Sequence, residues 1–255
     1  TNAYEPWEKD VILEKAESVE KPFQIDFSRQ WVFAYRLVPF VFIVLAIAAI
    51  IIGSRIFSYE KEKNMDMILV TIRNKKLRNI GRNKVLALLT FLSIGFLISM
   101  TIITVIFFSI TGFSAWFSQI QIEYFTSIYQ LTFGGAYLLF LFMGWISIMA
   151  IGVLVATINA FTQKSYSSLV IGFIFVFIPL VTARLDSVSI AVKKFFQLQP
   201  VNGFFIEKSI SSLQIYKFLF CNVLTTLAIN INSLLLLIVC IFIAPELFRL
   251  RIKKT

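Results

Sequence analysis

The segment Tyr59–Ile72 holds the residues whose types and spacing are most informative, and their chemistry is that of recognition rather than catalysis. Its apolar residues follow the spacing of one helix face: Met65, Ile68, Leu69 and Ile72. Acids lie in its first half and bases follow its end, an order that complements a helix macrodipole: Glu60, Glu62 and Asp66, then Arg73, Lys75, Lys76 and Arg78. The pattern predicts a short amphipathic helix.

Two roles fit such a helix. It can lie on a membrane surface, held by its apolar stripe and its basic neighbours. It can also insert the stripe into a groove on a partner protein. Three acids near the start of the segment would face anionic lipid unfavourably. The charge pattern therefore favours docking to a partner, with binding to the leaflet as the alternative.

Groups that catalyse reactions are scarce in the sequence. Histidine, the commonest general base and a frequent metal ligand, is absent from the 255 residues. No G-x-x-x-x-G-K-[ST] phosphate-binding loop occurs, so we do not expect the chain to bind ATP in that manner. We expect no catalytic residue, no metal site and no cofactor in this chain.

The composition predicts that lipid surrounds much of the chain. Apolar residues make up 58% of it and charged residues 15%, whereas soluble domains have about 45–50% and about 25%. Runs without Asp, Glu, Lys or Arg reach the length of a bilayer span, about 20 residues. The predicted fold is all-α, a polytopic membrane helix bundle over residues 37–244. Its five spans are 37–54, 85–110, 132–159, 166–183 and 218–244.

Basic residues near the span ends predict the orientation. The loop 55–84 holds nine Lys or Arg residues, whereas 111–131 holds none. This places the loop 55–84 and the basic tail 245–255 in the cytoplasm, and a hairpin 184–217 outside. Residues 1–36 are then the membrane-proximal end of an external domain. Five spans with an external start lead us to expect a sixth helix upstream.

The net charge of +10 has the same explanation. Fourteen of the 24 basic residues lie in the predicted cytoplasmic segments. Topology and attraction to anionic lipid account for them there. We therefore expect membrane lipid, and not nucleic acid, as the partner of these charges.

The order of span, short helix, basic stretch and span resembles the first cytoplasmic loop of ABC-2 type permeases, the membrane subunits of ATP-binding cassette transporters. The match follows the pattern E-x-E-x-x-M-D-x-I-L-x-T from Glu60 and continues to Lys84. Asn64 stands where the family often has glycine, and Ile72 where it often has proline. The Pro-centred aromatic segment Val192–Phe205 is similar to the short helical hairpin that precedes the family's last helix.

The resemblance implies a permease subunit of the cell membrane with a cytoplasmic C-terminus, and an exporter of amphipathic cargo such as a peptide, lipid or drug-like molecule. It implies that the chain is not itself an enzyme. A nucleotide-binding ATPase subunit, which holds ATP and Mg, would dock on the coupling helix. A second permease chain, the same or homologous, would complete the path. The implied coupling residues are Glu60, Glu62, Met65, Asp66, Ile68, Leu69, Ile72 and Arg73.

Small and amide side chains within the spans are candidates for a translocation path. Packing between helices is their default role in lipid. The candidate path residues are Thr225, Asn230, Asn232, Gly144 and Gly152. The polar turn 159–165 between two spans is a candidate second contact with the ATPase.

A function of a different class also fits the sequence. A membrane anchor or signalling subunit could use the 59–72 helix to bind a cytoplasmic partner. This explains the stripe and the charges equally well, but not the need for five spans with small residues and amides. Intramembrane catalysis fits poorly, because no span contains an acid, a histidine or a paired nucleophile and base.

Overall fold

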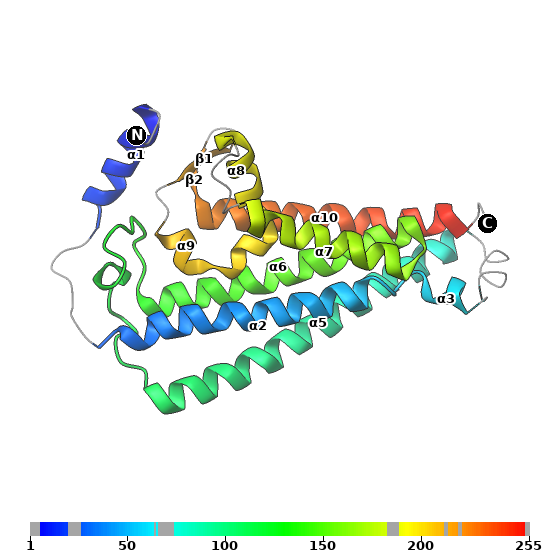
Figure 1. Ribbon diagram of the computed structural model, residues 1–255, viewed down its shortest axis with the longest axis horizontal. Helices are drawn as coiled ribbons and strands as arrows, with labels where there is room; N and C mark the ends of the chain where they lie inside the picture. The colour runs from blue at the N-terminus through cyan, green and yellow to red at the C-terminus, as the bar shows by residue number, and fades with distance from the viewer. Residues whose placement is uncertain are drawn as a thin grey trace.

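The computed structural model describes residues 6–19, 27–63, 65, 74–182, 189–211, 214–218 and 221–252. This part of the chain is almost entirely helical (Figure 1). Its helices are α1 (Pro6–Glu17), α2 (Arg29–Gly53), α3 (Tyr59–Glu62), α5 (Asn74–Thr111), α6 (Phe133–Thr162), α7 (Ser165–Thr182), α8 (Ile190–Gln197), α9 (Ile206–Ile210) and α10 (Thr225–Ile252). Two 3-10 turns, η1 (Ile120–Ile122) and η2 (Pro200–Phe204), and an antiparallel hairpin of β1 (Ile215–Phe218) and β2 (Cys221–Leu224) complete it.

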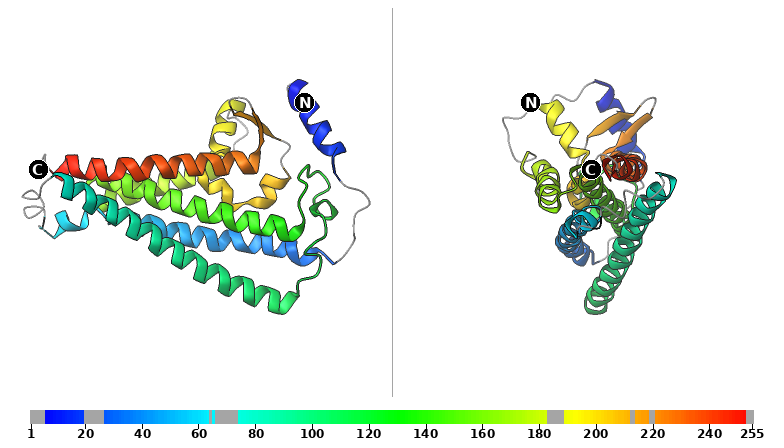
Figure 2. Two further views of the ribbon diagram at one scale, coloured as in Figure 1. Left: turned by 180° about the vertical axis from the view of Figure 1, so that it is seen from behind. Right: turned by 90° about the vertical axis from the view of Figure 1, so that its right-hand side faces the viewer.

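Five helices are long and apolar enough to cross a membrane: α2, α5, α6, α7 and α10. They lie side by side as a bundle, with α5 leaning away toward its C-terminal end (Figure 2). By helix length and composition the chain is a membrane protein. The all-α fold class predicted from the sequence is confirmed.

Helix α6 forms the centre of the bundle. In its most apolar stretch 67% of the residues are buried, against 22% to 39% in the other four long helices. Small residues let its neighbours approach closely. A Cβ atom added at Gly144 would lie 2.4 Å from the ring of Phe42 on α2, and one at Gly152 would lie 2.6 Å from Leu92 on α5.

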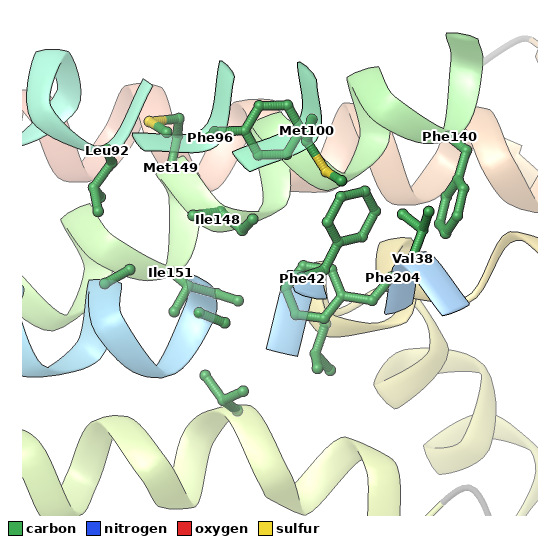
Figure 3. Packing of buried hydrophobic residues seen from close by; sticks show 14 of the residues in the cluster. Val38, Phe42, Leu92, Phe96, Met100, Phe140, Ile148, Met149, Ile151 and Phe204 are labelled. Atoms are coloured by element: carbon green, nitrogen blue, oxygen red, sulfur yellow. The ribbon is translucent and has the colours of Figure 1, made fainter. Parts of the chain in front are cut away.

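Aromatic rings fill the space around Phe42. Its ring centroid lies 5.0 Å from that of Phe140 on α6 and 5.7 Å from that of Phe204 on η2 (Figure 3). A third ring, that of Phe96 on α5, stacks at 5.7 Å. Four elements therefore meet at one buried aromatic cluster, a contact type that adds about 0.5–1.5 kcal/mol per pair to area burial.

Two helices start earlier than the sequence predicts. The first begins at Arg29 instead of residue 37, and the second begins at Asn74 instead of residue 85. A charged residue ends an apolar run but does not end a helix, since Arg and Lys are good helix formers. Arg36 lies on α2 and makes a surface ion pair with Glu207 at 3.2 Å.

The last helix starts later and ends later than predicted. Of the residues expected to open the last span, Phe218 lies on β1 and Cys221–Leu224 form β2, and α10 begins at Thr225. The predicted basic tail 245–255 is helical as far as Ile252, with Pro245 inside the helix. A short apolar run cannot be assigned to helix or strand by its spacing alone.

Candidate functional site

One end of the bundle collects the bases of the predicted coupling loop and of the chain's C-terminal turns. Helix α3, the start of α5, the turn between α6 and α7, and the end of α10 all lie there (Figure 1). We call it the basic end, and the opposite end, which carries β1, β2 and α1, the hairpin end. The described bases of the basic end are Arg55, Lys61, Lys63, Lys76, Arg78, Arg82, Lys84, Lys164, Arg249 and Arg251.

Asn159 ties the turn after α2 to the last part of α6. Its amide oxygen accepts hydrogen bonds from the backbone N–H groups of Phe57 at 2.8 Å and Ser58 at 3.0 Å. Its amide nitrogen donates to the hydroxyl of Ser168 on α7 at 3.1 Å. The side chain is completely buried, so these bonds satisfy groups that have no access to water.

Helix α3 is joined to the turn between α6 and α7. The hydroxyls of Ser58 and Ser165 lie 2.7 Å apart, and Ser165 donates to the carboxylate of Glu62. This hydrogen bond holds the pKa of the Glu62 carboxyl below its usual value. The ammonium of Lys61 donates to the amide oxygen of Gln163 at 3.3 Å. The described start of the predicted coupling segment, helix α3, thus lies in contact with the predicted second contact, the polar turn 159–165.

Lys84 connects the same turn to α5 and α10. Its ammonium donates to the carbonyl oxygen of Ile56 at 2.9 Å and pairs with the carboxylate of Glu60. It also lies over two rings, 5.6 Å from the centroid of Phe57 and 5.1 Å from that of Phe248. The side chain is 18% exposed, so these contacts are made largely out of water.

A surface ion-pair group adds a second link between α5 and α10. The guanidinium of Arg78 lies 2.7 Å from one carboxylate oxygen of Glu246, and that of Arg249 lies 2.9 Å from the other. These side chains are about one-third to one-half exposed. Each pair is therefore worth at most about 1 kcal/mol. Only the pair of Arg78 with Glu246 joins α5 to α10, since Arg249 and Glu246 both lie on α10.

The predicted coupling residues are only partly described. Glu60 and Glu62 lie on α3, and Met65 follows it with 47% of its surface exposed. The other predicted coupling positions lie outside the described residues: Asp66, Ile68, Leu69, Ile72 and Arg73. Helix α3 covers four residues of the expected 59–72 helix, and the apolar stripe stays a prediction.

The candidate path residues do not gather around one space in this chain. The volumes beside Gly144 and Gly152 are occupied by Phe42 and Leu92, as described above. The hydroxyl of Thr225 donates to the carbonyl oxygen of Gln214 at 2.8 Å, and the amide of Asn232 donates to that of Leu198 at 2.7 Å. In the described part of the chain, the amide oxygen of Asn230 is buried and accepts no hydrogen bond.

Two residues of the basic end are absent from the sequence-based site. Lys84 is only the last residue of the basic stretch in the permease resemblance, and Phe248 belongs to no motif. They meet because α5 and α10 converge at Phe57. Periodicity finds the helices that hold them. It gives no signal for a contact between segments so far apart in the chain.

No protein-family model, curated protein or solved structure matches this chain. The site is defined by its geometry: a polar network that joins the turn after α2 and helix α3 to α5, α6, α7 and α10.

Proposed function

We propose that this chain is the transmembrane permease subunit of an ABC transporter, an exporter of amphipathic cargo driven by ATP hydrolysis in a partner subunit. The observation that carries the proposal is the attachment of residues 56–62 to four long helices. Asn159 and Ser165 hold this segment on α6 and α7, and Lys84 holds it between α5 and α10. A partner that moves the segment therefore moves the helices with it.

In this mechanism the chain transmits force and carries out no covalent step. Closure of two nucleotide-binding subunits around ATP and Mg displaces the loop 55–84 toward one of two positions. The hydrogen bonds of Asn159 pass the displacement to α6, and the contacts of Lys84 pass it to α10. The bundle changes between two packings because the partner binds them with different affinity.

We also propose the location, the orientation and the partners of the chain. It lies in the cell membrane with the basic end and the C-terminus in the cytoplasm, as the positive-inside rule favours. A second permease chain, the same or homologous, completes the path between the two subunits. The cargo is a peptide, lipid or drug-like molecule, in keeping with the apolar and aromatic walls of the bundle.

The test is a substitution in the middle of the expected apolar stripe. Leu69→Asp places a carboxylate in a docking groove without a counter-charge, which costs several kcal/mol and weakens binding by a few powers of ten. We expect the variant to insert and fold but to lose the P-loop ATPase subunit on purification, or to hydrolyse ATP without transport. Arg82→Gln, an exposed change near the start of α5, is the matched control and should keep both the bound ATPase subunit and coupled transport.

The same experiment distinguishes the alternative, a membrane anchor or signalling subunit whose 59–72 helix binds the leaflet or another partner. If Leu69→Asp keeps an ATPase subunit bound and transport coupled while Arg82→Gln abolishes them, the coupling proposal is wrong. Purification of the wild-type chain from its native cells without any P-loop ATPase also contradicts it.

A further inference from the structure

A cavity of about 520 Å³ lies at the hairpin end, between α1 and the bundle. Four segments enclose it: the C-terminal part of α1, the loop that leads into α6, the first half of α6, and the junction of β2 with α10. It lies at the opposite end from the proposed coupling surface. The wall formed by the bundle is apolar, and the wall formed by α1 is charged.

The side formed by the bundle is apolar. Leu139 lines it from α6, Leu227 from the first turn of α10, and Leu131 and Leu224 from the segments just before these helices. Leu227 is 51% exposed, so this wall continues onto the outer face of the bundle. The apolar wall lies at the hairpin end, where the two long apolar helices α6 and α10 begin.

The side formed by α1 carries two opposite charges next to each other. Glu14 and Lys15 line the cavity, and neither side chain has an ion-pair partner among the described residues. Polar contacts at both ends of α1 help to hold it over the cavity. The amide of Gln130 donates to the carbonyl oxygen of Ser18 at 2.6 Å, and Lys194 on α8 pairs at 3.0 Å with Glu8, whose side chain is 5% exposed.

We propose that this cavity binds a zwitterionic amphiphile of the phospholipid class, taken from the leaflet at the hairpin end. The alkyl chain packs on Leu139 and Leu227, where burial of each CH₂ group is favourable. The ammonium of the head group pairs with Glu14 and its phosphate with Lys15. This site goes beyond the transport proposal, because binding here involves neither the basic end nor an ATPase.

The test uses the purified chain in nanodiscs that contain a trace of lysophosphatidylcholine with a diazirine at the end of its chain. After illumination, we expect peptides containing Leu139 and Leu227 to be labelled more strongly than the exposed apolar face of α5, which meets bulk lipid. The anionic lysophosphatidylglycerol probe should label them less. Equal labelling of α5, or equal labelling by the two probes, overturns the proposal.

Charge reversals on α1 test the head-group contacts. We expect Glu14→Lys and Lys15→Glu each to lower the labelling about tenfold, the factor for losing one charge-assisted contact. Lys9→Glu, an exposed change on the same helix outside the cavity, should leave it unchanged. Leu227→Trp narrows the apolar side without touching α1 and should also lower the labelling. Unchanged labelling in all of these variants contradicts the site.

Discussion

The buried amide oxygen of Asn159 accepts a hydrogen bond of 2.8 Å from the backbone N–H of Phe57, 102 residues earlier in the chain. Phe57 lies in the turn after helix α2, and a side chain rather than a backbone carbonyl accepts the hydrogen bond from its N–H group. Backbone groups buried without a partner are rare. The turn after α2 can keep its shape only while α6 stays beside it.

Asn159→Leu should destabilise the protein by about 2–4 kcal/mol, because it leaves the N–H groups of Phe57 and Ser58 buried without an acceptor. Thermal unfolding in detergent measures the loss. In a complex reconstituted with its ATPase, the variant should also transport less cargo per ATP hydrolysed.

Asn202→Leu is the matched control, on η2. It removes one hydrogen bond, to the carbonyl oxygen of Phe196, and should cost about 1 kcal/mol without changing transport per ATP. Equal uncoupling by both variants would show that Asn159 has no special role in coupling.

Lys84→Met keeps the aliphatic stem of the side chain but removes the ammonium that pairs with Glu60 and lies over Phe57 and Phe248. We expect a loss of about 1–3 kcal/mol in the free energy of unfolding, since Glu60 is left without its partner in a half-buried place. A double-mutant cycle with Glu60→Gln measures the coupling energy of the pair. A coupling energy of zero contradicts a role for the pair in holding the turn.

Gly144→Ala should destabilise the bundle by about 1–3 kcal/mol, because its Cβ would lie 2.4 Å from the fully buried ring of Phe42. Gly95→Ala is the control on α5, where an added Cβ meets nothing within 4 Å. That change should stabilise the helix by about 0.5–1 kcal/mol. If Gly144→Ala left stability unchanged and altered only the cargo preference, Gly144 would belong to the path.

The pH dependence of the α3 attachment follows from Glu62. The hydrogen bond from Ser165 lowers the pKa of the Glu62 carboxyl in the folded protein. This hydrogen bond therefore stabilises the fold fully above the ordinary glutamate pKa of about 4.3. The stabilisation is lost as the pH falls through the lower pKa that Glu62 has in the folded protein. Ser165→Ala should therefore melt below the wild type at neutral pH, and the difference should shrink under more acidic conditions. In a Glu62→Gln background, the effect of Ser165→Ala should not change with pH.

The five long helices could be predicted because apolar runs of span length leave few alternatives in a chain of this composition. Their ends could not, because they depend on contacts between distant segments. Helix α2, for example, begins at Arg29 and runs through Arg36, which makes a surface ion pair with Glu207. The strands before α10 are only four residues each, and for segments so short helical and extended backbone both fit the sequence.

In the candidate site, too, some residues could be predicted from the sequence and their contacts could not. The acids of α3 and the polar turn at Asn159 stand out in the sequence, because polar residues next to apolar spans are conspicuous. Their mutual contact does not follow from the sequence, since it requires the order in which the helices pack. The contacts of Lys84 could not be predicted for the same reason. Its partners Phe57 and Phe248 are apolar residues far apart in the chain, and only the packing of α5 against α10 brings them to Lys84.

Helix α10 spans the whole distance between the two ends of the molecule. At the hairpin end the backbone N–H of Thr226 donates to the hydroxyl of Tyr129, and at the basic end Phe248 packs on Phe57. Its 28 residues make a rod about 42 Å long. Such a rod acts as a lever: a tilt of about 5° around one end displaces the other by about 4 Å. The basic end and the cavity between α1 and the bundle are therefore both in contact with this single helix.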